Sequence, residues 1–213
     1  MSEIGSFSVH EAPMLVPAMV VLLGCWAFLL AVGARELVRW RPDRGWWIPW
    51  ALAVATTALV VLWVPLTPEI RWRLAWSYSS DGTQEVLKYG LGWPLLVRVV
   101  VMLTGYPYGA PFVMNAVIAG LCVPLLMGLV RQLGGDARSA SACGVVLALT
   151  PLHLWYGHTD TPFLADAFFS LLTYLAVASF GRDGRAMWMG VAVAGLVSAA
   201  QMRTEAVLTG PLA

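Results

Sequence analysis

Long apolar runs that contain no charged residue are the feature that most restricts how this chain can fold. The first run, from Ala12 to Ala34, has 23 residues and no Asp, Glu, Lys or Arg. An α-helix rises about 1.5 Å per residue, so roughly 20 such residues cross the hydrocarbon core of a bilayer. The run therefore predicts a membrane-spanning helix. The preceding segment, Met1 to Glu11, carries two acids and no Lys or Arg, so we expect this helix to be retained rather than cleaved as a signal peptide.

Further apolar runs follow the first one along the chain. Gly and Pro residues between Thr104 and Pro111 interrupt the uncharged stretch that begins after Arg98, and the part after the interruption is long enough to span. We therefore expect an all-α fold, a polytopic integral membrane helical bundle of about six transmembrane helices in a single membrane domain, 1–213. The expected spans are 12–34, 45–66, 111–130, 139–157, 161–181 and 186–207.

The composition agrees with a membrane location and excludes several other classes of protein. Hydrophobic residues make up 59% of the chain and charged residues 12%, whereas a soluble domain carries about 25% charged residues. A formal net charge of +1 gives no reason to expect a nucleic-acid partner. Cys25, Cys122 and Cys143 each lie within an apolar run, where a thiol behaves as a small hydrophobic side chain rather than as a metal ligand.

The distribution of charge between the two sides of the bundle predicts its orientation. Eight of the 13 Lys and Arg residues lie in the connections between the first and second, third and fourth, and fifth and sixth expected spans. Eight of the 12 acids lie on the other side. Because short cytoplasmic connections retain positive charge, we expect a multi-pass protein of the bacterial inner membrane or an equivalent membrane, with its amino terminus outside.

The connection 67–110 is the long one, and it is expected to be extracytoplasmic and to contain short interfacial helices. The stretch 79–90 predicts one of them, with Asp81 near its amino-terminal cap and Lys88 in its last turn. Asp81 and Glu85 would then lie one turn apart on one face. In one interpretation Asp81 is a helix cap and Glu85 a surface acid paired with Lys88; in the other, both are candidate catalytic carboxylates.

The next stretch, Leu91 to Gly105, is apolar but too short to span, and it contains Arg98. Its length and composition predict an interfacial or re-entrant helix against the outer leaflet. Two interpretations of Arg98 stay open. Its side chain either reaches lipid headgroups or supplies a fixed cation for the phosphate of a ligand.

A second group of polar residues lies where the fourth expected span ends and the fifth begins. His158, Asp160 and Asp166 occur within nine residues, and they resemble part of a site but match no metal-binding spacing, so no metal is expected. Asp166 lies one turn inside the fifth span, where an ionised carboxylate is costly unless it faces protein or a wet cavity. Arg203 and Glu205 lie on the same outer side, near the end of the last span.

The order of these features resembles the amino-terminal half of a polytopic glycosyltransferase of the GT-C class, similar to family 39, the protein O-mannosyltransferases and the lipid A aminoarabinose transferase. The acid of the first outer loop in that class matches Asp81 in Ser-Ser-Asp-Gly-Thr-Gln-Glu, and the interfacial helix matches the Gly-Trp-Pro-Leu-Leu of 92–96. The stretch 147–156, followed by Asp160, is similar to a later pattern of the class, and so is the Arg-Thr-Glu-Ala of 203–206.

The resemblance implies an enzyme that transfers a sugar from a polyprenyl-phosphate donor to an acceptor hydroxyl on the extracytoplasmic side. It implies Asp81 or Glu85 as the base, since Gly82 stands where the class usually has a second acid. Arg98, Arg203 and Lys88 would bind the donor phosphate. Membrane lipids and the lipid-linked donor are the implied partners, no organic cofactor is implied, and a divalent cation stays open.

Two other classes of function stay open beside this one. Members of the GT-C class usually continue for several more helices, so the chain is alternatively a truncated, non-catalytic remnant, or it acts with a carboxy-terminal half or a partner chain. The other alternative is a small polytopic transporter subunit. A transporter would place charges near the middle of the bilayer on broken helices, whereas here the charges gather near the outer ends and in the connections.

Overall fold

In the computed structural model, the described residues are 15–39, 45, 47–65, 90–105 and 109–203, and every regular element among them is a helix. This confirms the all-helical part of the predicted fold. The helices are α1 (Leu15–Arg39), α2 (Trp47–Trp63), α5 (Gly92–Thr104), α6 (Ala110–Gln132), α7 (Ala137–Leu149), α8 (Pro151–Gly157), α9 (Phe163–Asp183) and α10 (Ala186–Met202).

Three helices of the described part, α1, α6 and α9, are long and apolar enough to cross a membrane. The pair α7 and α8 passes the same test together and forms a fourth candidate, although the two helices are bent by 59°. Helices α2 and α10 are apolar but have 17 residues each. By length and composition, therefore, the fold is that of a membrane protein with three or four candidate spans.

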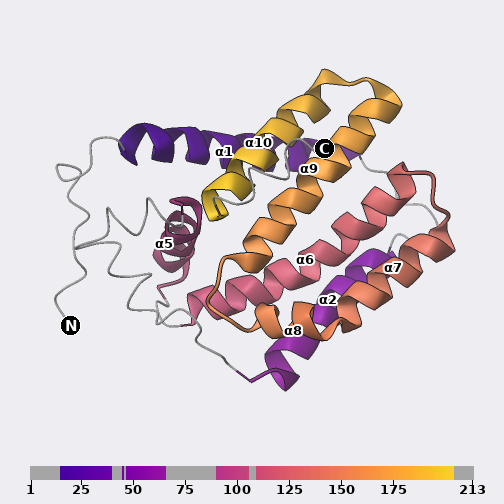
Figure 1. The fold of residues 1–213 in the computed structure, drawn as a ribbon, viewed down its shortest axis with the longest axis horizontal. Coiled ribbons are helices and arrows are strands. Elements are labelled where there is room, and N and C mark those ends of the chain that lie inside the picture. Colours follow the sequence, from indigo (N-terminus) through magenta and orange to yellow (C-terminus); the bar gives the residue numbers. More distant parts are fainter. Residues whose placement is uncertain (1–14, 40–44, 46, 66–89, 106–108, 204–213) are drawn as a thin grey trace.

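Helix α6 lies in the middle of the bundle, with α9 on one side and α2 and α7 on the other (Figure 1). Helix α10 packs beside α9, and α1 packs on α10. Small residues allow the close approaches. A Cβ atom at Gly120 of α6 would lie 2.5 Å from the carbonyl oxygen of Ala53 on α2, and the Thr57 hydroxyl of α2 donates to Ala116 O at 3.2 Å. Close packing of this kind holds helices together where the hydrophobic effect cannot, because lipid is as apolar as the side chains.

The fourth expected span, 139–157, is not one straight helix. It breaks at Thr150, whose backbone is extended, and Pro151 starts the short helix α8. A residue before proline avoids the helical conformation, because the proline ring collides with its backbone, and proline itself has no N–H to continue the ladder. The break bends the segment by 59°, and α8 then leads into a loop, Gly157 to Pro162.

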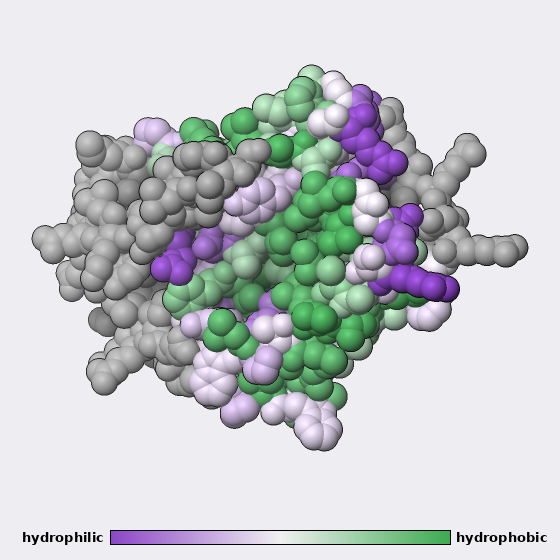
Figure 2. Space-filling model, turned by 45° about the vertical axis from the view of Figure 1, so that its right-hand side comes forward, coloured by the Kyte–Doolittle hydropathy of each residue, from purple (hydrophilic) through white to green (hydrophobic). Residues whose placement is uncertain are grey.

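The face of the bundle drawn in Figure 2 is largely apolar where its residues are described. Green hydrophobic residues cover the middle of this face, and hydrophilic residues gather along its right-hand edge. Large exposed side chains include Val54, Leu62, Val146 and Val193. A soluble monomer rarely exposes so much apolar surface, whereas contact with lipid chains explains it.

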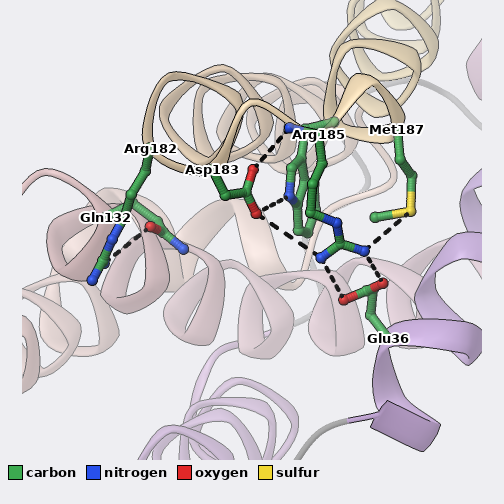
Figure 3. Close-up of polar contacts among 7 residues, drawn as sticks. Glu36, Gln132, Arg182, Asp183, Arg185 and Met187 are labelled. Carbon is green, nitrogen blue, oxygen red and sulfur yellow. Dashed lines mark hydrogen bonds and ion pairs between the residues drawn. The ribbon is translucent and has the colours of Figure 1, made fainter.

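One end of the bundle is held by ion pairs and polar contacts (Figure 3). The Arg185 guanidinium, between α9 and α10, donates to the Glu36 carboxylate of α1 at 2.8 Å, and this contact raises the pKa of Arg185 above its usual value. Trp188 Nε1 donates to Asp183 Oδ2 at 3.0 Å. Arg182 donates to the side-chain oxygen of Gln132, so α6 is tied to α9 at the same end.

Candidate functional site

The candidate site lies at the opposite end of the bundle, around the loop Gly157 to Pro162 that joins α8 to α9. All six residues of this loop are buried. Non-helical backbone in a membrane protein must find hydrogen-bond partners within the protein or in a wet cavity, because lipid offers none. The hydrogen bonds to the backbone of this loop therefore determine the structure of the site.

Three consecutive carbonyl groups of the loop accept hydrogen bonds from two side chains. Asn115 of α6 donates through Nδ2 to both Thr159 O and Thr161 O, each at 2.8 Å. Trp93 of α5 donates through Nε1 to Asp160 O at 2.9 Å. Asn115 is 0% exposed and Trp93 is 4% exposed. Asn115 thus holds the carbonyls on both sides of Asp160, and Trp93, from a second helix, holds the carbonyl of Asp160 itself.

The two histidines near the loop are each engaged with a backbone carbonyl of another segment. His158 Nδ1 makes a short hydrogen bond with Val64 O, just after α2, and the His158 ring lies edge-on to Phe112 with 6.3 Å between centroids. His153 Nε2 bonds Ala119 O of α6 at 3.0 Å. A carbonyl oxygen can only accept a hydrogen bond, so Nε2 of His153 and Nδ1 of His158 are the donors in these two contacts. His158 therefore belongs to the site by position, and one of its nitrogens is used to hold the loop against α2.

Helix α5 is docked on the carboxyl end of α10 by glycines. A Cβ atom at Gly90 or Gly92 would collide with the carbonyl oxygen of Gln201, and Gly90 has a φ of +85° that favours glycine. The backbone N–H of Leu91 donates to Gln201 Oε1 at 3.4 Å. These contacts place the start of α5 beside the end of α10, which is followed directly by Arg203.

The stretch Leu91 to Gly105, which the sequence predicts as a short helix at the interface, forms α5. Its first part is buried, including Trp93, Leu95 and Val97, and Gly105 ends it in the left-handed conformation typical of a helix stop. Arg98 is exposed, and so are the apolar residues near the end of the helix, Met102 and Leu103. A short helix that is buried at its start and exposed at its end suits a place at the edge of the bundle.

The charged residues singled out in the sequence fall at this end where the structure describes them. The Arg203 guanidinium carbon lies 4.5 Å from the centroid of the Phe163 ring, a cation–π contact with the first residue of α9. Asp166 lies one turn further along α9 and is half-buried, and Asp160 is 3% exposed in the loop. Arg203 thus packs against the start of α9, the helix that carries Asp166, while Asp160 lies in the preceding loop and Arg98 on α5. The residues Asp81, Glu85, Lys88 and Glu205 lie outside the described residues.

Sequence reasoning missed Asn115, which makes the most hydrogen bonds to the loop. A signal for it was present, because Asn115 is the only Asn in the 213-residue chain and lies inside an apolar run. A polar amide in a membrane helix requires a partner. Its partners lie 44 and 46 residues further along the chain, so the sequence could indicate that a partner exists but not which one.

The chemistry available at this end is that of carboxylates and guanidinium groups. Among the described residues, no cluster of three or more His, Cys, Asp or Glu side chains is arranged to hold a metal ion. Guanidinium groups bind phosphate oxygens, and carboxylates accept protons or hydrogen bonds from hydroxyls. Comparison of the chain with family models, with curated proteins and with solved structures finds no match in any of the three.

Proposed function

We propose that this chain is a membrane glycosyltransferase, or the amino-terminal portion of one, which transfers a sugar from a polyprenyl-phosphate donor to an acceptor hydroxyl on the extracytoplasmic side. The observation that carries the proposal is the convergence of α5, the loop Gly157 to Pro162 and the end of α10 at one end of an apolar bundle. This convergence gathers Arg203, Asp160 and Asp166 there.

The proposed topology has six crossings, made by α1, α2, α6, the α7–α8 pair, α9 and α10, with α5 at the outer interface. The 17 residues of α2 and of α10 rise about 26 Å, slightly less than the roughly 30 Å of a bilayer core. Arginines at the end that carries the Arg185–Glu36 pair, among them Arg131, Arg138 and Arg182, support a cytoplasmic position for that end. The candidate site then faces the extracytoplasmic side.

The proposed reaction is a single displacement with inversion. The acceptor oxygen attacks the anomeric carbon of the sugar, and the bond between that carbon and the phosphate oxygen breaks. The electron pair leaves with the polyprenyl phosphate, and a carboxylate takes the acceptor's proton. The leaving group is already a stable anion, so a cation helps it more than an acid, and Arg203, Arg98 and Lys88 are the proposed cations. Asp81 or Glu85 is the proposed base.

The test is transfer from a labelled polyprenyl-phosphate sugar in membranes that contain the chain, measured as release of polyprenyl phosphate. Asp81→Asn keeps the shape of the side chain but cannot accept the proton, so we expect turnover to fall by about 10²- to 10⁴-fold. Arg203→Gln should weaken donor binding. Arg138→Gln, at the other end of the bundle, is the matched control and should change neither. If turnover stays unchanged in both Asp81→Asn and Glu85→Gln with normal membrane insertion, the proposed base is wrong.

The break between α7 and α8 favours a second candidate, a small transporter subunit. Broken helices with buried non-helical backbone line substrate paths in many secondary transporters. The segment from Thr150 to Pro162 has both features, a 59° bend and a fully buried loop. Reconstituted vesicles distinguish the candidates. Solute uptake in the absence of donor turnover would favour the transporter, whereas donor binding with neither turnover nor uptake would favour a non-catalytic remnant.

A further inference from the structure

Three side-chain hydrogen bonds hold the backbone around Asp160. The carbonyls of Thr159, Asp160 and Thr161 all accept side-chain hydrogen bonds, and the hydroxyls of Thr159 and Thr161 bond each other at 2.8 Å. Turning any of the peptide groups around Asp160 would break at least one of these bonds in a place where water cannot replace it. The direction in which the Asp160 side chain leaves the loop is therefore fixed.

The side-chain amide of Asn115 is suited to its position. One nitrogen with two N–H groups reaches two carbonyls that flank a single residue, each at 2.8 Å. An Asp side chain there would turn oxygens toward the same carbonyls, and an apolar side chain would leave both without a donor. Asn115 is fully buried on α6, the central helix of the bundle, so its own position is set by packing rather than by the loop.

The second donor comes from a helix at the edge of the bundle. Trp93 belongs to α5, which carries Arg98 and is docked on the end of α10 next to Arg203. The bond from Trp93 to Asp160 O thus links the backbone of the carboxylate-bearing residue to the helix that carries one of the proposed phosphate cations. The core helix α6 thus supplies the two donors that flank Asp160, and α5 supplies the donor to Asp160 O.

We propose that Asn115 is a positioning residue, which together with Trp93 fixes the loop on both sides of Asp160 and thereby holds the Asp160 carboxylate where the lipid-linked sugar donor binds. The role of Asp160 toward the donor rests on the proposed function. The holding of the loop by Asn115 does not, so the two parts are tested by separate measurements.

The first measurement is thiol reactivity. In a chain whose native cysteines are replaced, Asp160→Cys is treated with a small methanethiosulfonate reagent in nanodiscs. The buried thiol should react slowly, and adding Asn115→Ala should speed labelling about tenfold, since two hydrogen bonds that close the loop are lost, whereas Trp93→Phe should speed it about threefold. Ser198→Ala is the matched control, because Ser198 is equally buried and its hydroxyl bonds Ala194 O within α10. An unchanged labelling rate in Asn115→Ala, or an equal increase in Ser198→Ala, would overturn the positioning role.

The second measurement is the affinity for the donor, measured with a polyprenyl-phosphate sugar in nanodiscs. If Asn115 acts through Asp160, the affinity losses of Asn115→Ala and Asp160→Asn should not add in the double variant, whereas those of Asn115→Ala and Arg98→Gln should add. General destabilisation would not produce that selective non-additivity. Additive losses at Asn115 and Asp160 would contradict the link. A wild-type chain that does not bind the donor, yet shows the labelling pattern above, would overturn the proposed function and leave the holding of the loop by Asn115 in place.

Discussion

Replacing Gly92 by alanine should separate α5 from α10 at the candidate site. A Cβ atom at position 92 would lie 2.8 Å from both the carbonyl carbon and the oxygen of Gln201, and 3.1 Å from the backbone nitrogen of Met202. All three atoms belong to the backbone, so no side-chain rotation can relieve the contact. Reaching 3.4 Å, where ordinary contact begins, requires a shift of 0.6 Å between the two helices.

The cost of that shift follows from what it disturbs. Overpacking of a well-packed contact costs about 1–3 kcal/mol. Alanine in a helix interior recovers at most about 1 kcal/mol of backbone propensity, and Gly92 is the first residue of α5, where the gain is smaller. The net free energy of unfolding should therefore fall by about 1–2 kcal/mol. Because Trp93 is the next residue, its bond to Asp160 O should lengthen as well.

The assay is unfolding in detergent followed by circular dichroism, together with thiol labelling of Asp160→Cys. Gly181→Ala is the control, because a Cβ atom at Gly181 on α9 would have no neighbouring atom within 4 Å. The control should be as stable as the wild type or slightly more so. If Gly92→Ala unfolds together with the control and labels no faster than its parent, α5 is not docked on α10 in the way described.

Two other substitutions test the rest of the bundle. Gly120→Ala should lower the free energy of unfolding by about 1–3 kcal/mol, because its Cβ atom would meet Ala53 O and the Thr57 hydroxyl on α2. If this variant unfolds like the wild type, α2 is not closely packed on α6. Asp136 caps α7 by accepting from the Ser139 N–H at 2.7 Å, and this bond lowers the pKa of Asp136 below its usual 3.8. Its contribution to stability should thus be complete above about pH 4 and be lost as the pH falls through the lowered pKa. Asp136→Asn still caps but does not titrate, so the wild type should lose more stability than this variant between pH 6 and pH 3; equal losses in thermal unfolding would exclude the cap as the source.

The helices could be predicted from the sequence because their signal is local. Apolar runs with at most one charged residue marked α1, α6 and α9 to within about five residues, since burial in lipid acts on every residue of a span in the same way. The break at Thr150 was also encoded locally, in the Pro that follows it, but an apolar run of spanning length concealed it. Proline inside a run does not always break a helix, as Pro124 within α6 demonstrates.

The site could be predicted only in part. The order of the spans determines at which end its charged residues lie, whereas its hydrogen bonds join segments that are far apart in the sequence. His158, Asp160, Asp166 and Arg203 could be assigned to one end from the order of the spans, which puts alternate connections on the same side. The scaffold depends on contacts between distant segments, such as Trp93 with a carbonyl 67 residues away. Such contacts are set by how the helices pack, and no local pattern of residues records them.

The central claim is that the end of the bundle formed by α5, the loop Gly157 to Pro162 and the end of α10 faces the extracytoplasmic side. It is tested most directly with single cysteines in a cysteine-free chain, at Thr104 near that end and at Leu133 near the other, both exposed. In intact cells, an impermeant thiol reagent should label Thr104→Cys, and it should label Leu133→Cys only after lysis. The reverse pattern would put the candidate site in the cytoplasm and contradict the account.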